Sequence, residues 1–174
     1  MLEKNELLQI GNYISHGDKA VEKVLKKCVS DFDAYYEECV EDFEERGFDE
    51  DEMEEYEEEE LQLISLAYIL INHGHCCELD WKCAKEDFVW SFSKLYGVEF
   101  YNLTWEEDWL DEDANVTKWC SVLDEKWQEK GVCIAALDLC SDSYVIFPVL
   151  EKDLEKLMEL ADEIDCKIAL AKDM

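Results

Sequence analysis

Hydrophobic residues recur at alternating steps of three and four in the first third of the chain. The series consists of Val21, Leu25, Cys28, Phe32, Tyr35, Cys39 and Phe43. This spacing places the side chains on one face of an α-helix. It predicts one long amphipathic helix from about Asp18 to Arg46, in which Asp18 is the N-cap and Gly47 ends the helix.

A second stripe of the same period follows, made of Met53, Tyr56, Leu63, Ile64, Ala67, Leu70 and Ile71. It predicts another helix that begins near Asp49 and ends near Gly74. Glu60 lies on the apolar side of this pattern, and the pattern gives no reason for it. Two consecutive helices joined by a few residues pack against each other, so we predict a long antiparallel helical hairpin over residues 18–72.

The pattern changes after residue 75. Short apolar runs rich in β-branched and aromatic residues predict strands at 76–81, 132–140, 144–150 and 166–171, and the turn SDS at 141–143 predicts a β-hairpin. Helical spacing between the strands predicts helices at 84–95, 115–131 and 152–164. We therefore expect an α+β fold in a single domain, residues 1–174. The helical hairpin would pack with a small mixed sheet of about four strands and its helices, over residues 76–174.

Acidic residues are concentrated where the two predicted helices join. Residues 31–60 hold eighteen Asp and Glu against Arg46 alone, a charge of −17, whereas five lysines and four acids give residues 1–30 a charge of +1. In the predicted hairpin these carboxylates would meet at one end. The acidic tip, our candidate interaction surface, consists of Glu41, Asp42, Glu44, Glu45, Asp49, Glu50, Asp51, Glu54, Glu55, Glu57 and Glu58.

The formal charge of −30 restricts the classes of partner. Nucleic-acid binding is excluded, because a polyanion is bound by Lys and Arg that displace its counterions, and anionic membrane surfaces are disfavoured. No apolar run reaches the roughly 18 residues that a membrane span needs. The N-terminal residues are too acidic for a signal peptide, so we expect a cytoplasmic protein with reduced thiols. A basic protein partner is the expected kind, no cofactor is indicated, and the oligomeric state stays open.

Two groups of residues are candidates for a catalytic or metal-binding site. Asp80 and Asp138 interrupt apolar strands, and with Ser141, Asp142 and Ser143 of the turn they would form a polar site if both strands ended at one edge. The alternative is that Asp and Ser of turns bond to their own backbone, and a nucleophilic serine would also need a histidine base that no local pattern supplies.

A zinc site is the second candidate, with His73, His75, Cys76 and Cys83 as the weak ligand set. Their spacing lacks the paired cysteines of zinc fingers, and Cys76 and its neighbour would point to opposite faces of a strand. The alternative is that the cysteines are small apolar side chains in a helix-to-strand turn.

Three tryptophans, Trp105, Trp109 and Trp119, are interleaved with acidic residues. They would either line an anionic groove for a cationic ligand or an Arg-rich partner, or serve as packing anchors, which is the more common role.

The stretches ELDWK, EDFVWSFSKL and ALDLCSDSYVIFPV, followed by the helix over Leu154–Ile164, resemble a known family. It is a family of uncharacterised bacterial proteins, a domain of unknown function, whose C-terminal part carries an LDxxSDSYxxFPV-like stretch. The resemblance covers about Glu78 to Leu170 and implies a bacterial, intracellular, stand-alone domain without an activity to transfer.

Three hypotheses about function follow. The first is a non-enzymatic interaction module, such as an immunity-type or inhibitor protein that masks the basic surface of a nuclease. The second is an enzyme or metal-dependent domain that uses Asp80, Asp138 and Asp142. The third is that the acidity serves solubility alone, because a large net charge suppresses aggregation.

Overall fold

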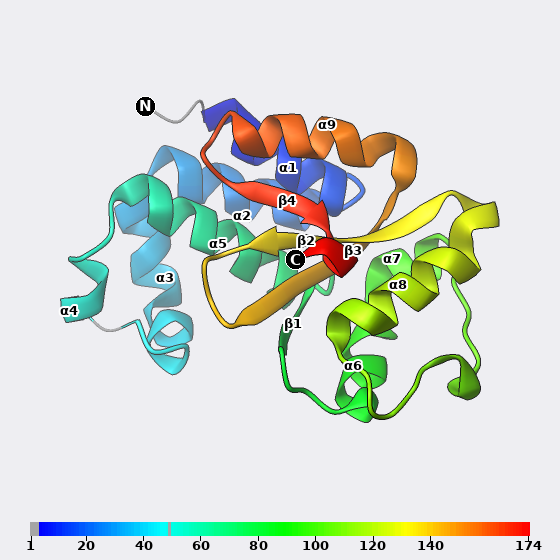
Figure 1. Cartoon of the computed structure of the whole chain (residues 1–174). Coiled ribbons are helices and arrows are strands. Elements are labelled where there is room, and N and C mark those ends of the chain that lie inside the picture. The colour runs from blue at the N-terminus through cyan, green and yellow to red at the C-terminus, as the bar shows by residue number, and fades with distance from the viewer. Residues whose placement is uncertain (1–3, 49) are drawn as a thin grey trace.

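The computed structural model of the chain describes residues 4–48 and 50–174. A four-stranded sheet lies at its centre, in the strand order β1-β3-β2-β4. The strands are β1 (Cys77–Asp80), β2 (Val132–Asp138), β3 (Ser143–Leu150) and β4 (Lys167–Leu170). Figure 1 shows helices on both sides of this sheet, so the fold is α+β, as the sequence predicts.

All strand pairs in the sheet are antiparallel, and the prediction of a mixed sheet is therefore wrong. β2 and β3 form the predicted hairpin around residues 139–142. Helix α9 (Glu151–Asp162) then carries the chain back, so that β4 runs in the same direction as β3. Because β2 lies between β3 and β4, each of its two pairings is antiparallel.

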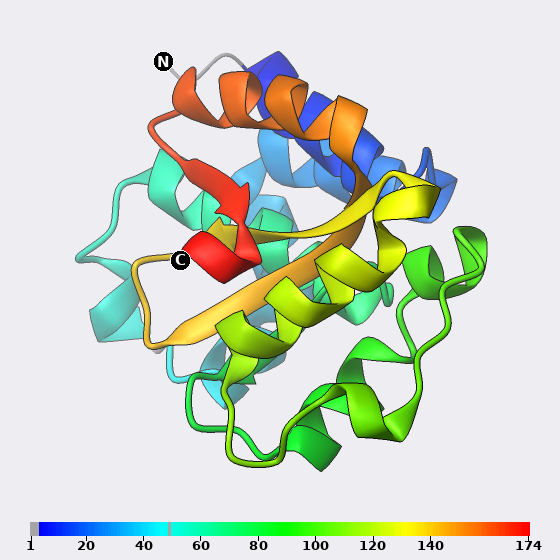
Figure 2. The same ribbon diagram turned by 45° about the vertical axis from the view of Figure 1, so that its right-hand side comes forward.

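The two faces of the sheet are covered by different helices. Cys133, Ala135 and Leu137 of β2 belong to one core. Its helices are α1 (Lys4–Ile14), α2 (Lys19–Ser30), α3 (Phe32–Glu45), α5 (Glu58–Asn72) and α9. The alternate residues of β2 face a second core, formed with α6 (Lys85–Phe92), α7 (Tyr96–Phe100) and α8 (Val116–Trp127). Figure 2 shows both layers. A strand buried on both faces reads as a continuous apolar run, which explains the sequence of β2.

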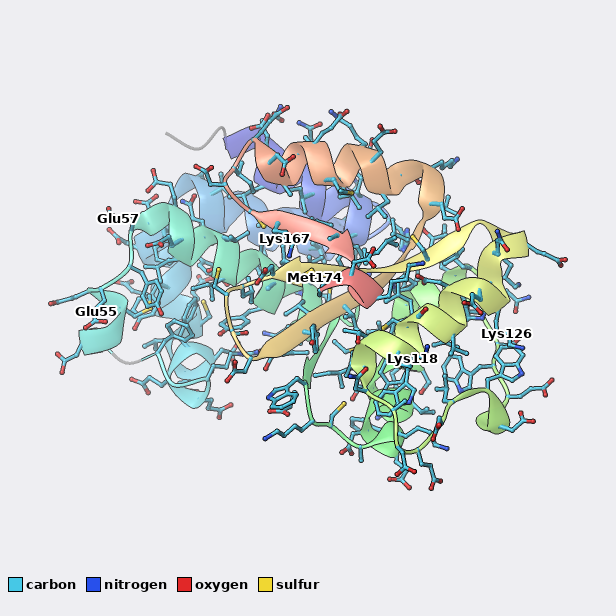
Figure 3. All side chains as sticks on the ribbon, in the orientation of Figure 1. Glu55, Glu57, Lys118, Lys126, Lys167 and Met174 are labelled. Carbon is cyan, nitrogen blue, oxygen red and sulfur yellow. The ribbon has the colours of Figure 1, made fainter. Side chains whose placement is uncertain are left out.

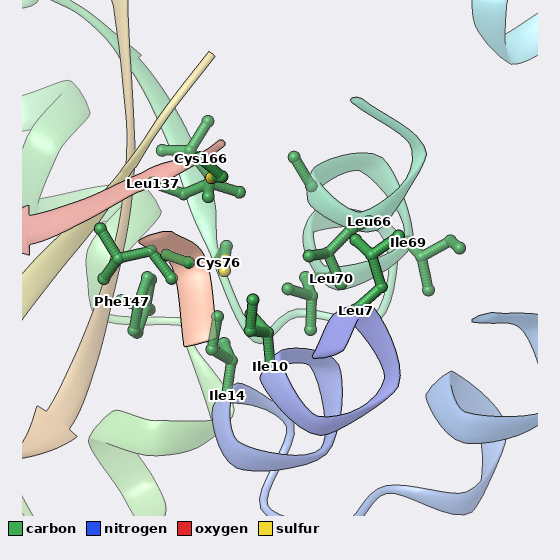
Figure 4. Packing of buried hydrophobic residues seen from close by; sticks show 14 of the residues in the cluster. Leu7, Ile10, Ile14, Leu66, Ile69, Leu70, Cys76, Leu137, Phe147 and Cys166 are labelled. Atoms are coloured by element: carbon green, nitrogen blue, oxygen red, sulfur yellow. The ribbon is translucent and has the colours of Figure 1, made fainter. Parts of the chain in front are cut away.

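Helix α1 is not predicted by the sequence analysis. Leu7, Ile10 and Ile14 are nevertheless spaced by three and four and are buried in the first core. Figure 4 shows these side chains between the sheet, where Phe147 lies, and α5, where Leu66 lies. The stripe contains only three residues, which is too short to stand out from the chain by pattern alone.

The prediction of one helix from Asp18 to Arg46 is wrong at Asp31. α2 ends there and α3 begins, because Asp31 takes an extended conformation (φ −154°, ψ 80°). Its carboxylate accepts a hydrogen bond from the Ala34 N–H at 3.2 Å, and this side-chain cap competes with continuation of the helix. The cap at Asp18 is confirmed, because its carboxylate accepts from the Ala20 N–H at 2.8 Å.

The helical hairpin is formed by α2 and α5. Asp18 at the start of α2 bonds His75, which follows the end of α5, and Cys28 near the end of α2 lies beside Ser65 at the middle of α5. α3 instead turns away and packs its C-terminal turns against the C-terminal half of α5. Asn72 bridges the two helices, because it accepts from Arg46 at 3.1 Å and donates to Asp42 at 3.4 Å.

The second predicted helix is also divided. A short helix α4 (Glu50–Met53) precedes α5, and Glu57 caps α5. The Glu60 carboxylate accepts a hydrogen bond from the Glu57 N–H at 2.9 Å, as in a capping box. This bond is the reason for the acidic residue on the apolar side of the pattern.

Helices α6, α8 and α9 and the four strands follow the prediction closely, whereas α7 is not predicted. The described residues also form the 3₁₀ turns η1 (Glu107–Trp109), η2 (Gln128–Lys130) and η3 (Ala171–Asp173). Gly131 ends the α8–η2 segment with a left-handed conformation (φ 63°), as its position predicts. Among the helices of residues 4–48 and 50–174, none combines the length and apolar character required to cross a membrane.

Candidate functional site

The acidic segment from Asp31 to Glu60 lies on the surface of α3, α4 and the start of α5. Figure 3 shows Glu55 and Glu57 at one end of the molecule. Nine residues of the acidic tip are exposed, namely Glu41, Asp42, Glu44, Glu45, Asp51, Glu54, Glu55, Glu57 and Glu58. Asp49 lies outside the described residues, as does the side chain of Glu50. Since α3 turns away from the start of α5, these carboxylates cover a broad end of the molecule rather than a narrow point.

Arg46 is the single basic residue of this segment, and its contacts bind it to the fold. Its guanidinium lies 4.0 Å from the centre of the Tyr68 ring. The group also donates to Asn72 at 3.1 Å and to Glu78 at 3.5 Å. Arg46 therefore joins α3 to α5 and β1, and its ion pair is with Glu78 rather than with the exposed carboxylates described in α4 and at the start of α5.

An aromatic cluster anchors the acidic segment. Phe43 is buried, and its ring lies 5.7 Å from Tyr68 and 6.2 Å from Phe48. Phe48 in turn contacts Tyr56 at 5.6 Å, and Met53 packs against the same core. Met53 and Tyr56 therefore hold the acidic residues to the folded chain, although they belong to α4 and a turn and not to one continuous helix.

The polar residues of the sheet converge at one edge. In the register, Asp80 of β1 lies opposite Ser143 of β3, and Asp138 of β2 lies opposite Lys167 of β4. A shallow pocket of about 300 Å³ opens here, lined by Trp81, Asp138, Ser141, Asp142, Ser143, Tyr144, Lys167 and Met174. The alternation of strand residues and the hairpin turn thus bring the predicted group together.

The oxygen atoms at this edge are largely used by the backbone. Asp138 Oδ1 accepts from the Cys140 N–H at 2.8 Å, and its Oδ2 lies 3.9 Å from Lys167 Nζ. Asp80 accepts from the Lys82 N–H at 2.7 Å, and Ser141 Oγ accepts from the Ser143 N–H at 3.3 Å. These are the bonds of Asx and Ser turns, which fits the structural role of these residues.

A groove joins the polar edge to the acidic segment. It has a volume of about 530 Å³, and one wall is formed by Tyr56 and Glu60 of the acidic segment together with Leu63 and Ile64 of α5. The opposite wall is formed by Asp138, Leu139, Cys140, Asp162, Asp165, Cys166 and Lys167. Burial raises the pKa of the Cys166 thiol to about 12, so this cysteine stays a neutral wall residue. The groove is acidic, and its lysine is already paired with Asp138.

The four weak zinc ligands do not come together. His75 is buried and bonds Asp18 at 2.9 Å, while His73 Nδ1 bonds the Ile69 carbonyl at 2.8 Å. Cys76 belongs to the first core and Cys83 packs against the second. Within residues 4–48 and 50–174, no three His, Cys, Asp or Glu side chains are grouped to hold a metal ion.

One histidine that the sequence analysis leaves unassigned lies in a pocket. His16 has a left-handed conformation (φ 55°) and stacks on Phe100 at 4.4 Å. Burial lowers the pKa of His16, and the nearby His75 lowers it further. His16 lines a pocket of about 370 Å³ together with Tyr101 and Asp153. No local signal in the sequence marks His16, because its neighbours come from α7 and α9.

Comparisons with known proteins bear on the family. Neither the comparison with curated proteins nor the comparison with solved structures found a match. The family model of a domain of unknown function (DUF6630) matches residues 6–171, and the chain belongs to that family.

Proposed function

We propose that this protein is a non-enzymatic interaction module that binds a basic protein surface through the acidic groove and the exposed acids around it. One such module would be an immunity-type or inhibitor protein that masks the basic surface of a nuclease. The supporting observation is the groove, which is lined by Glu60 from the acidic segment and by Asp138, Asp162 and Asp165 from the sheet side. A concave anionic surface of this kind fits a protruding basic segment.

The charge distribution supports the same proposal. Arg46 is held in internal contacts, so the exposed carboxylates of the segment face solvent with little compensation. A concentrated field of one sign speeds encounter with an oppositely charged partner, and salt weakens the attraction within a Debye length of about 8 Å at physiological ionic strength. Exposed charges that serve solubility alone require no such concentration on one end.

A cytoplasmic location and a bacterial source are part of the proposal. The nine cysteines support this location, because all are free thiols, as expected of proteins in a reducing compartment.

The test compares two variants that carry the same change in charge. One replaces Glu54, Glu55, Glu57 and Glu58 by Gln. The control replaces four exposed acids of the α7–α8 end by Gln, namely Glu99, Glu106, Glu125 and Glu129. A partner captured from lysate of the source cell at low salt is identified, purified and titrated against the three proteins by calorimetry.

Each exposed pair contributes about 0.2–1 kcal/mol, so we expect the acidic-segment variant to lose about 1–4 kcal/mol of binding free energy. This corresponds to roughly fivefold to nearly a thousandfold in affinity. The control variant should bind like the unmodified protein, and affinity should fall steeply with added salt. Equal losses in both variants would favour a general charge effect, and no captured partner at low salt would overturn the proposal.

A further inference from the structure

The tryptophans that follow β1 lie in distinct environments. Trp119 is fully buried, and its indole N–H donates to the Asp111 carbonyl at 2.7 Å, so it is a packing anchor. Trp81, Trp90 and Trp109 each have a lysine of the same chain over the ring: Lys82 at 4.4 Å, Lys94 at 2.9 Å and Lys126 at 4.8 Å. The faces of the surface tryptophans thus already attract cations, as expected from the negative potential of an indole face.

Trp105 differs from these three, because no lysine or arginine of the described residues lies over its ring. Phe92 and Trp127 hold the ring from the core at centroid distances of 6.4 and 6.2 Å. Trp105 also lines a pocket of about 320 Å³, whose apolar walls are completed by Val89, Trp90 and Leu110. Trp90 is 65% exposed and has Lys94 over its ring, so the two indole walls differ. Trp105 is fixed by the core and has no cation of the described residues over its ring, whereas Trp90 lies at the surface and contributes mainly apolar area.

The charged groups at the rim of this pocket make it anionic. Glu86, Lys85 and Glu112 line it. The Lys85 ammonium is occupied, because it donates to the Leu110 carbonyl at 3.2 Å and lies 3.5 Å from Glu112. Glu86 is exposed and has no ion-pair partner among the described residues. The segment from 104 to 115 adds acidic side chains and no basic one.

We propose that this pocket binds a trimethylammonium group, presented by a small quaternary ammonium compound or by a methylated lysine side chain. Such a cation carries its charge under methyl groups, so it gains from indole faces and apolar walls and needs no hydrogen-bond acceptor. A guanidinium or a bare ammonium would need several acceptors, whereas the walls offer four apolar side chains and the acids stand at the rim. The volume is that of a small-ligand pocket.

This site goes beyond the proposed function and does not depend on it. The pocket is built on α6 and the loop that follows α7, on the face of the sheet opposite to α2 and α5. Figure 3 shows Lys126 of α8 at the end of the molecule opposite to Glu55. Loss of binding at one surface would therefore leave the other intact.

The test uses choline and its neutral isostere 3,3-dimethylbutan-1-ol. Both are titrated into ¹⁵N-labelled protein, and the indole N–H signals of the tryptophans are followed by NMR. We expect choline to shift the Trp105 and Trp90 signals with a dissociation constant in the millimolar range or below. The neutral alcohol should bind at least about tenfold more weakly, since it lacks the cation.

Variants locate the site and control for misfolding. Trp90→Leu changes an exposed ring and Glu86→Gln an exposed carboxylate, so both should fold, and each should weaken choline binding severalfold. Trp81→Leu, an exposed tryptophan outside the pocket, should bind choline normally. Tighter binding of a trimethyllysine peptide than of choline would identify a methylated side chain as the source, and equal or weaker binding would identify a free compound. Equal affinity for choline and the neutral alcohol, or an unchanged Trp90→Leu variant, would overturn the proposal.

Discussion

Replacement of Asp124 by Ala tests how a buried carboxylate joins α8 to the sheet. Asp124 is 5% exposed, and its Oδ1 accepts a hydrogen bond from the Ile134 N–H of β2 at 2.8 Å. Its Oδ2 lies 3.2 Å from Lys172 Nζ in η3. One side chain therefore holds a helix, a central strand and the C-terminal turn together.

The magnitude follows from the groups that lose a partner. Asp124→Ala leaves the buried Ile134 N–H unpaired, which costs about 1–3 kcal/mol. Lys172 is one-third exposed, so solvent screens its ion pair and its loss adds less than about 1 kcal/mol. We expect about 1–4 kcal/mol less stability, or a Tm lower by roughly 2–16 °C in a chain of this size.

Urea denaturation followed by circular dichroism measures this loss, with two controls. Asp124→Asn keeps an acceptor for Ile134 and should cost about half as much. Asp173→Ala removes an exposed acid of the same turn and should leave the free energy of unfolding within about 0.5 kcal/mol of the unmodified value. If Asp124→Ala unfolded like Asp173→Ala, the Ile134 hydrogen bond would be shown to contribute nothing.

The effect of Asp124 on folding stability should change with pH in a definite direction. Burial raises the pKa of Asp124 above its ordinary value of 3.8. The folded chain then holds this proton more tightly than the unfolded chain, so the ionised carboxylate lowers stability at neutral pH. As pH falls through the raised pKa towards 3.8, the unmodified protein should gain stability relative to Asp124→Asn. The opposite trend would mean that the partners of Asp124 outweigh its burial.

Other predictions concern the first core and the thiols. Gly11→Ala should lower stability by up to about 2 kcal/mol in urea denaturation, because a Cβ would lie 2.5 Å from Leu25 Cδ2, and overpacking exceeds the gain of about 1 kcal/mol in helix propensity. A hydrogen bond from His75 lowers the pKa of Asp18, so its contribution is present at neutral pH and is lost as pH falls below 3.8. Asp18→Asn should therefore cost about 1 kcal/mol or less at pH 6 and almost nothing near pH 3, and an equal loss at both values would contradict the assignment. A thiol reagent should modify Cys140 first, since it is the exposed cysteine, and mass spectrometry of the modified peptides checks the order.

The elements that the sequence predicts correctly are those fixed by local signals. The β2–β3 hairpin follows from two apolar runs around a turn, and Gly131 marks the end of the segment before β2. The break at Asp31 could not be predicted from spacing, because the apolar stripe continues in phase across it. Only the hydrogen bond to the Ala34 N–H distinguishes the cap from an ordinary polar position inside a helix.

The polar edge and the groove are likewise predictable only where a local signal marks their residues. Asp80 and Asp138 stand out because they interrupt apolar strands, and the antiparallel hairpin brings them to one edge. Asp162 and Asp165 of the groove carry no such signal. Their place depends on β4 pairing with β2, a contact between distant segments that the local pattern does not encode.

The acidic segment also has a physical cost that bears on its role. Carboxylates in the first turn of α5 are favoured by the helix dipole, whereas those in the last turn of α3 are opposed by it, each by about 0.3–1 kcal/mol at low salt. The aromatic contacts of Phe43 and Phe48 hold the segment in spite of this repulsion. Added salt should therefore stabilise the fold while it weakens the attraction to a basic partner. A surface evolved for solubility alone gains nothing from concentrating that repulsion on one end, so the opposite salt responses of folding and binding distinguish an interaction surface from a solubilising one.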